Sequence, residues 1–176
     1  PAETKVKLDN LIAQLVRFER LVDEDAPLYE VLPTTYKQYF AQYRDYTIRQ
    51  LCQEMHDFFK DRNVKDLQKK LFRREFLPEY AMRPQDAHYA FIRGQRELVP
   101  IAEIEGRIAL EGALPYPPGV LCVVPGERWS PTAVQYFLAL EESLNALPGF
   151  AMEIQGVYLE HEDDGRVRAY GYVLKE

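Results

Sequence analysis

The sequence is poor in cysteine, in histidine and in long hydrophobic runs, and each shortage excludes a class of protein. Its 2 cysteines, Cys52 and Cys122, cannot make the disulfide framework of a small secreted domain. The 3 histidines lie far apart, without a Glu or Cys partner at metal-ligand spacing, so no zinc site is expected. No run approaches the roughly 18 consecutive apolar residues of a membrane span, and no secretory leader is recognised. These absences favour the reducing cytoplasm and exclude a membrane partner.

Motifs for nucleotide and nucleophile chemistry are missing as well. The chain has no GxGxxG, no Walker-type loop and no serine in a nucleophile elbow. Cys122 stands in an apolar run, where a small buried hydrophobe is favoured over a nucleophile. We therefore expect a folded domain without catalytic residues of its own.

The charge balance is acidic, with 28 Asp and Glu against 22 Lys and Arg and a net charge of −6. A nucleic-acid partner is not expected, because such proteins need a cationic surface to displace phosphate counterions. One local exception is a basic patch, for which a solvated or interface face is favoured over a phosphate site. Its members are Lys65, Lys69, Lys70, Arg73 and Arg74.

What the chain does contain is ample material for a core, since 47% of its 176 residues are hydrophobic and 12% are aromatic. Helical periodicity dominates the first half, and short apolar bursts appear in the second. This order predicts an α+β fold: N-terminal helices, then a small mixed sheet with packed helices and a C-terminal β-hairpin. We expect a helical linker or packing region over residues 1–80 and an α+β domain over residues 81–176.

In the first half, the apolar spacing predicts a helix over residues 4–23, a long helix over residues 36–61 and a shorter one over residues 64–72, capped by Asn63. The long helix carries a stripe of tyrosine and phenylalanine that includes Tyr36, Tyr39, Tyr43 and Tyr46. A broad aromatic stripe of this kind predicts a core face or a subunit interface.

In the second half, the turn residues delimit the expected elements. Pro84 and Gly94 bound one helix, and a second helix starts at the Ser130-Pro131 cap and closes at Pro148-Gly149. An antiparallel hairpin is expected around the turn at residues 163–165. Its strands, together with three further predicted strands, cover residues 154–159, 167–174, 97–101, 106–110 and 119–124.

The most unusual segment is the run of three prolines and a glycine at residues 115–119, which leads into the last of those three strands. Prolines stiffen the backbone into an extended path, and Gly119 releases it. A second turn, Pro125-Gly126-Glu127, follows at the far end of the strand. Chemistry alone leaves two interpretations open: a rigid connection between elements, or a wall that a ligand or another domain meets at a fixed position.

This segment carries a resemblance to a known family. The chain resembles the carboxy-terminal domain of the bacterial ornithine/lysine/arginine decarboxylases, which are pyridoxal-phosphate enzymes of the aspartate-aminotransferase fold type. The match has fixed prolines and glycines at fixed spacing. The amino-acid sequence of residues 113–127 resembles that of the ornithine-acting members most. The matching stretches are residues 106–109, 112–120, 125–127, 147–150, 155–158 and 170–174.

The resemblance implies that the catalytic residues lie elsewhere. Enzymes of this family hold pyridoxal 5'-phosphate on a lysine that follows a histidine, and this chain has no His-Lys dipeptide. The sequence also begins at Pro1. We therefore expect a longer polypeptide whose preceding cofactor domain binds the cofactor, and which assembles into homodimers or larger homo-oligomers.

By the same resemblance, this domain packs on the cofactor domain and helps to shape the route to the active site. The candidate residues for the substrate channel or the domain interface are Tyr116, Pro117, Pro118, Gly119 and Glu127. The expected reaction converts L-ornithine to putrescine and CO2. Two alternatives stay open: the same domain in a lysine or arginine decarboxylase, and a module that assembles or regulates without chemistry.

Overall fold

The structure is a computed structural model that describes residues 2–116 and 119–176. The chain divides into two compact units, Pro1–Phe58 and Phe59–Glu176, called here the first and the second unit. The division expected near residue 80 stays a prediction.

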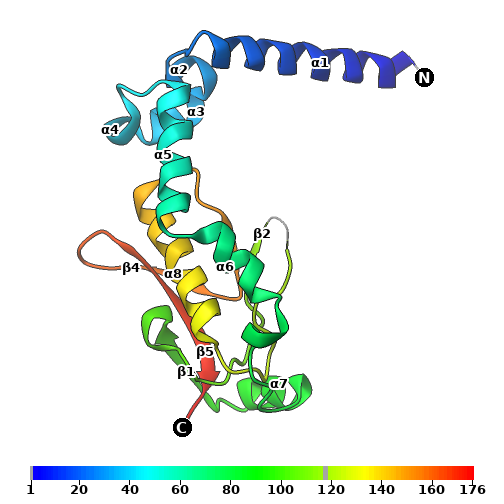
Figure 1. Ribbon diagram of the computed structural model, residues 1–176, viewed down its shortest axis with the longest axis vertical. Coiled ribbons are helices and arrows are strands. Elements are labelled where there is room, and N and C mark those ends of the chain that lie inside the picture. Colours follow the sequence, from blue (N-terminus) through cyan, green and yellow to red (C-terminus); the bar gives the residue numbers. More distant parts are fainter. Residues whose placement is uncertain (1, 117–118) are drawn as a thin grey trace. The chain divides into compact units, whose positions relative to one another are not determined.

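The first unit consists of helices joined by short turns, α1 (Ala2–Asp23), α2 (Leu28–Val31), α3 (Pro33–Gln38), α4 (Phe40–Tyr43) and most of α5 (Ile48–Asp61) (Figure 1). The helix predicted over residues 4–23 is confirmed by α1.

The start of α5 is tied to the end of α1 by side-chain and backbone hydrogen bonds. The guanidinium of Arg49 donates to the carbonyl of Val22 at 3.0 Å and to that of Asp23 at 2.7 Å. The N–H of Ile48 donates to the carbonyl of Ala26 at 3.0 Å. Because the last carbonyls of a helix lack partners within it, Arg49 caps α1 and holds it against α5.

The prediction of one helix over residues 36–61 is wrong, because the chain breaks twice, at Tyr39 and between Arg44 and Thr47. A capping box explains the second break. The side-chain oxygen of Thr47 accepts from the N–H of Gln50 at 3.4 Å, and the side chain of Gln50 accepts from the N–H of Thr47 at 2.9 Å. This reciprocal pair satisfies two amides at a new helix start, so α5 begins at Ile48.

The second unit carries two antiparallel sheets and the helices that cover them. Strands β1 (Arg96–Pro100), β5 (Val167–Leu174) and β4 (Tyr158–His161) form one sheet in that order. Strands β2 (Leu114–Tyr116) and β3 (Glu153–Gln155) form the other. Among the described residues the named strands pair antiparallel, which differs from the mixed sheet expected, and the α+β class is confirmed.

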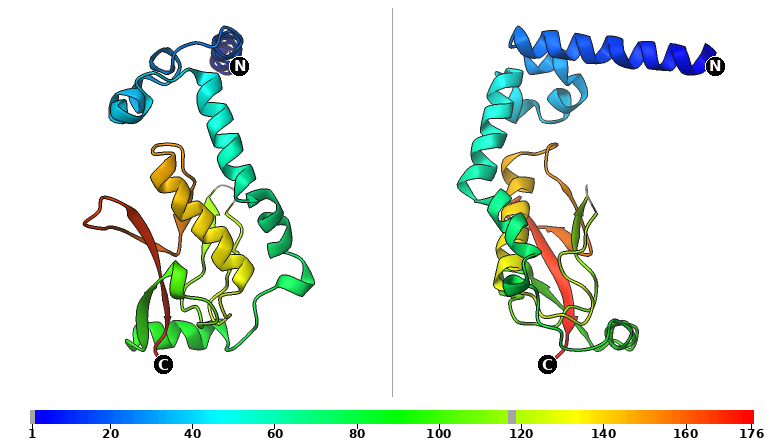
Figure 2. Two further views of the ribbon diagram at one scale, coloured as in Figure 1. Left: turned by 60° about the vertical axis from the view of Figure 1, so that its left-hand side comes forward. Right: turned by 45° about the vertical axis from the view of Figure 1, so that its right-hand side comes forward.

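Helix α8 (Pro131–Ala146) lies on one face of the larger sheet (Figures 1 and 2). The N–H of Ala169 in β5 donates to a carboxylate oxygen of Glu141 in α8 at 2.7 Å. Helices α6 (Val64–Leu71) and α7 (Pro84–Ile92) and the 3-10 turns η1 (Arg74–Phe76) and η2 (Ile101–Glu103) complete the unit.

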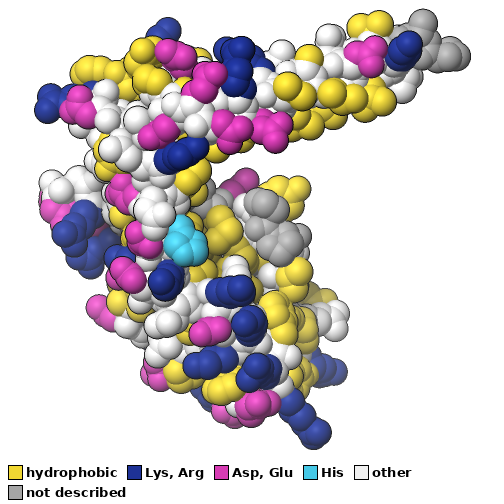
Figure 3. Space-filling view, turned by 45° about the horizontal axis from the view of Figure 1, so that its top comes forward, with side chains coloured by type: hydrophobic (Ala, Val, Ile, Leu, Met, Phe, Trp, Pro, Cys, Tyr) yellow, Lys and Arg dark blue, Asp and Glu magenta, His cyan; other side chains and the backbone are white. Residues whose placement is uncertain are grey.

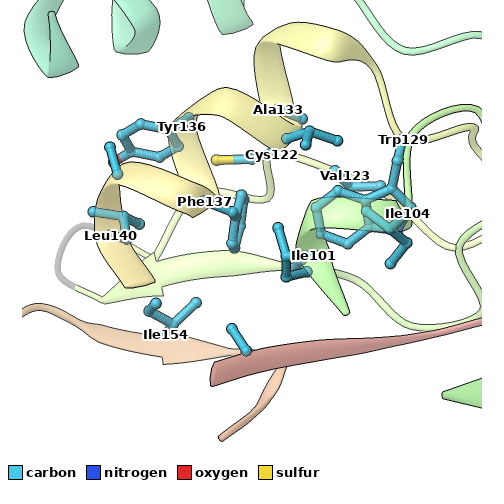
Figure 4. Close-up of a cluster of buried hydrophobic side chains, with 14 of the residues drawn as sticks. Ile101, Ile104, Cys122, Val123, Trp129, Ala133, Tyr136, Phe137, Leu140 and Ile154 are labelled. Atoms are coloured by element: carbon cyan, nitrogen blue, oxygen red, sulfur yellow. The ribbon is translucent and has the colours of Figure 1, made fainter. Parts of the chain in front are cut away.

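One cluster of buried side chains fills the space between α8, α6 and the sheets. Trp129 and Phe137 meet edge to face, with ring centroids 5.3 Å apart (Figure 4). Alternate residues of β5 are buried against this cluster, and a Cβ at Gly171 would meet the Ile104 side chain at 2.6 Å. The largest fully buried side chains of the cluster include Trp129, Tyr136, Phe137, Ile101, Ile104 and Leu140.

Several boundaries in this unit follow the predicted turn chemistry. The Ser130 side chain accepts from the N–H of Ala133 at 3.2 Å, and Pro131 opens α8, so this predicted cap is confirmed. Gly94, with φ of +76°, ends α7 as expected. The hairpin of β4 and β5 turns at Gly165, with φ of +80°.

Two predicted strands are absent from the described residues. Residues 106–110 and 119–124 are connections whose strand-like pairing is limited to isolated bridges, such as Ala109 with Val173 and Ala113 with Val123. Val120 and Leu121 are 48% and 43% exposed, so their apolar run is not a buried strand. Similarly, residues 154 and 155, predicted as part of the hairpin, belong to β3 and pair instead with β2. A short apolar run does not specify its partner strand.

Candidate functional site

The structure describes three residues of the proline-rich segment: Pro115 and Tyr116, at the end of β2, and Gly119. The N–H of Gly119 donates to the carbonyl of Pro115 at 3.0 Å. Gly119 has φ of +79°, and a Cβ there would lie 3.2 Å from the Tyr116 ring, so a glycine lets the chain pass over that ring. Tyr116 is 52% exposed and Gly119 is exposed, while Pro117 and Pro118 lie outside the described residues.

A close backbone contact between Gly156 and Gly112 lies at the other end of the β2–β3 pair. A Cβ at Gly156, just after β3, would overlap the carbonyl oxygen of Gly112, just before β2. Gly156 also has φ of +77°, so only glycine is free of strain there. Tyr116 is thus the last residue of a two-stranded sheet with a tightly packed base at Gly112 and Gly156, and its side chain is exposed.

Glu127 lies in a different place from Tyr116. Its carboxylate accepts from the N–H of Val124 at 2.8 Å and closes its own turn. Its backbone bridges Tyr80, whereas Tyr116 pairs with Glu153. Of the five candidate residues, the structure thus describes three. Tyr116 and Gly119 lie in the proline-rich segment, and Glu127 lies in the separate turn with Val124.

A groove that sequence reasoning missed lies between α6 and α8 and has a volume of about 460 Å³. Arg62 and Glu142 form an ion pair at its rim, and Asn63, Asp66, Lys70 and Gln135 contribute polar groups. Leu67, Leu138 and Ala139 form its apolar part. The residues come from helices far apart in sequence, so no local pattern could reveal the groove. Its charges of both signs favour no one class of ligand.

The basic patch lies on α6 and the segment after it, and all five of its members are exposed. Lys69 lies 3.6 Å from a carboxylate oxygen of Asp66, and the Lys70 ammonium stands 5.8 Å from the Phe76 ring centre. These are the ordinary contacts of a solvated helix face.

The chain offers little for nucleophilic or metal chemistry. Burial raises the pKa of the Cys122 thiol to about 11, so it stays protonated near neutral pH. The described residues include no group of three or more His, Cys, Asp and Glu side chains that could hold a metal ion. No helix in the part of the chain that the structure describes is long and apolar enough to cross a membrane.

The residues present do not fit a pyridoxal-phosphate site. That cofactor needs a lysine held in an enclosed pocket for its Schiff base. Every lysine of this chain is exposed, and Lys70, which reaches the α6–α8 groove, shares it with the carboxylates of Asp66 and Glu142. No step of a cofactor reaction is therefore assigned to residues of this chain.

The antiparallel sheets and the covering helix α8 together define an α+β domain. Comparison with known families identifies it. The model of the family "Orn/Lys/Arg decarboxylase, C-terminal domain" matches residues 65–175, and the chain belongs to this family.

Individual relatives extend the match to the first unit. The chain is 62% identical to an ornithine decarboxylase of Haemophilus influenzae over 100% of its own length, and 61% identical to the constitutive ornithine decarboxylase of Escherichia coli over 99%. It is 35% identical to the lysine decarboxylase LdcA of Pseudomonas aeruginosa over 95% of its length. These alignments cover 24%, 25% and 22% of the relatives, so the chain spans about a quarter of their length.

Solved structures share the fold. The constitutive lysine decarboxylase of Escherichia coli superimposes with a TM-score of 0.84 at 30% sequence identity, over 97% of this chain and 24% of that protein. Lysine decarboxylase A from Pseudomonas aeruginosa gives a TM-score of 0.87 at 33% identity, over 96% of this chain and 23% of that protein. The resemblance expected from the proline-rich segment is thus confirmed.

Proposed function

We propose that this chain is the carboxy-terminal domain of a pyridoxal-phosphate enzyme that converts L-ornithine to putrescine and CO2. The choice of ornithine as substrate rests on a difference in sequence identity between two groups of relatives. Four ornithine decarboxylases are 58–62% identical to the chain, whereas four lysine decarboxylases are 33–35% identical.

The substrate is tested by assaying the full-length polypeptide with L-ornithine, L-lysine and L-arginine. We expect the highest kcat/KM for ornithine. A preference for lysine or arginine would assign the enzyme to the other branches of the family. No turnover of any of the three would favour a domain that assembles or regulates.

The cofactor is proposed to bind the part of the polypeptide that precedes this chain. The exposed lysines and the absence of a His-Lys dipeptide support this assignment. The chain alone, incubated with pyridoxal phosphate, should develop no stable aldimine absorbance and should not decarboxylate ornithine. A stoichiometric absorbance band that survives gel filtration would contradict the proposal.

Within the enzyme, we propose that the turn from Tyr116 to Gly119, with Pro117 and Pro118, faces the substrate route or the neighbouring domain. The exposed Tyr116 ring on a rigid base supports this role. Replacing Tyr116 by Ala in the full-length enzyme should lower kcat/KM or the melting temperature. If neither changes, the turn serves only to connect elements.

Glu127 is proposed to raise the local concentration of the cationic substrate through its charge. The Glu127→Gln variant should lower kcat/KM, with a smaller loss at high salt, because salt screens the attraction. The substitution keeps an oxygen that can accept from Val124, so it isolates the charge from the turn geometry. Glu103→Gln is the matched control elsewhere in the unit. An unchanged value at low salt removes the steering role.

Assembly into homo-oligomers is proposed to use the aromatic surface of the first unit. Tyr29 and Phe40 are 50% and 53% exposed, and both pack edge to face on Tyr36. In the full-length enzyme, Phe40→Ser should shift the sedimentation profile toward smaller species. Phe72→Ser, a matched change at a 56% exposed position of the second unit, should leave it unchanged. Equal profiles for both variants would place the subunit contact elsewhere.

The proposed compartment is the cytoplasm. Cys52 and Cys122 are both free, as expected for a reducing environment.

A further inference from the structure

Helix α1 carries a row of apolar side chains that nothing in its unit covers. The row, called here the α1 stripe, is visible along the helix in Figure 3. Each of its members is between 47% and 59% exposed. The members are Leu8, Leu11, Ile12, Leu15, Val16 and Phe18. Isolated apolar residues are normal on surfaces, but a contiguous set of this size marks an interaction site.

The first unit buries other residues instead. Its fully enclosed side chains, Leu28, Tyr43 and Leu51, come from α2, α4 and α5. Among the α1 residues whose burial is described, Leu21, at the carboxyl end, is the only buried hydrophobic one. The helix is therefore held by its last turn, and the turns before it offer their apolar face to a surface outside the unit.

The width of the α1 stripe indicates the kind of surface that covers it. The spacing 8, 11, 12, 15, 16 follows the i, i+3, i+4, i+7, i+8 pattern of a helix packed on a globular core. A two-stranded coiled coil has a narrower seam and sustains it over three or four heptads. Here the apolar heptad positions run only from Leu8 to Val22, with Thr4 and Asp25 at the next positions on either side. A folded domain fits this face better than the α1 of a second copy.

The comparison with relatives indicates where such a folded domain would come from. The family model is that of a carboxy-terminal domain, and the chain covers only 24% of the Haemophilus influenzae relative. We propose that the α1 stripe docks on the portion of the same polypeptide that precedes this chain. A tethered domain meets α1 at a high effective concentration, which a free second copy does not.

Hydrogen exchange at the α1 amides tests the proposal. In the full-length polypeptide these amides should exchange slower than in the chain alone, on the order of tenfold or more. Leu15→Gln in the full-length polypeptide should restore the fast exchange. Val6→Gln is the matched control, since Val6 is on the opposite face of α1 and is 58% exposed against 59% for Leu15. Equal α1 exchange in the two chains would overturn the proposal.

A cross-linking experiment separates the preceding domain from a second copy. In the full-length polypeptide with a photoreactive Leu15→p-benzoylphenylalanine substitution, peptide mass spectrometry should find position 15 joined to a peptide from the preceding part of the same chain, in a product of monomer mass. A product of dimer mass would contradict the proposal. So would α1 protection in the chain alone that rises with protein concentration.

The inference rests on the proposed function only in requiring a longer polypeptide. An α1 that is protected in a full-length protein without decarboxylase activity would refute the enzyme assignment and keep the docking site. An active decarboxylase with an unprotected α1 would support the enzyme assignment and refute the docking site.

Discussion

The two units differ in how they bury their apolar side chains. In the second unit, one cluster joins α6, α8 and β5 around Trp129 and Phe137. In the first unit, short helices enclose Tyr43 and Leu51, while the α1 stripe stays in contact with solvent. Local opening costs little where few apolar contacts are made, so α1 should open far more readily than α8. The second unit has the properties of a self-sufficient domain, and the first those of a connection built to be covered.

The largest effect should come from deleting a large core side chain in the second unit. In the chain alone, Phe137→Ala should lower the free energy of unfolding by about 3–5 kcal/mol, since it leaves a cavity beside Trp129. Leu15→Ala, in α1, should cost less than about 0.5 kcal/mol, because that site is open. Urea unfolding followed by circular dichroism measures both. Similar losses for the two variants would remove the contrast between the units.

A smaller effect is expected at the glycine beneath the proline-rich turn. Gly156→Ala should destabilise the second unit by more than about 1–3 kcal/mol, the usual cost of backbone strain, because its Cβ would also overlap the carbonyl of Gly112. Gly165→Ala is the control, with φ of +80° but no atom within 4 Å of its Cβ. Thermal melts should give a lower melting temperature for Gly156→Ala than for Gly165→Ala. The opposite order would show that the base of the turn can relax.

The helix caps allow a matched comparison of the two units. Thr47→Ala removes one side of the capping box of α5, and Ser130→Ala removes the cap of α8. Each should cost about 1 kcal/mol of helix stability. Hydrogen exchange should show the first loss as faster opening of α5 and the second as a lower global stability. If each variant accelerated hydrogen exchange equally in both units, the two units would unfold together.

The smallest effect concerns alkaline pH. Burial, and then the charge of Glu54, raise the pKa of Tyr43 to about 12. Burial, and then its hydrogen bond to Glu111, raise the pKa of Tyr158 to about 12. Both contributions are complete below the unfolded pKa of about 10 and are lost as the pH rises from there through 12.

Each phenol should therefore report on its own unit. Tyr43→Phe should flatten the alkaline loss of stability in the first unit, and Tyr158→Phe that in the second. The effect of Tyr158 is the weaker of the two, because that side chain is 40% exposed and Tyr43 is fully buried. Phenolate absorbance and unfolding midpoints between pH 9 and 12 measure both. A titration of either tyrosine at the unperturbed value would contradict the burial argument.

Much of the fold was predictable from local chemistry. The Ser130-Pro131 cap and the stop at Gly94 specify their helix ends through side chains and backbone angles that neighbours in sequence provide. Thr47-x-x-Gln50 forms a capping box before α5, but the prediction of one helix over residues 36–61 rested only on the periodicity of its apolar and aromatic residues. Periodicity alone does not distinguish one long helix from three short ones on the same face.

The strands at residues 106–110 and 119–124 could not be decided in this way. An apolar burst predicts an extended chain, but a strand also needs a partner along its length, and these residues met only single bridges. The candidate site divides along the same line. Gly119 is the residue type that its φ of +79° favours, whereas the separate neighbours of Tyr116 and Glu127 could not be predicted from the sequence.

The sequence by itself determined the Ser130-Pro131 cap, the turn glycines at residues 94 and 165 and the family, because each depends on residue identity at short spacing. Tertiary structure alone decided which apolar faces are covered. The α1 stripe and the face of α8 have similar periodic patterns, yet one is open and the other enclosed. Burial is a property of what packs against a residue, and that partner lies far away in the chain.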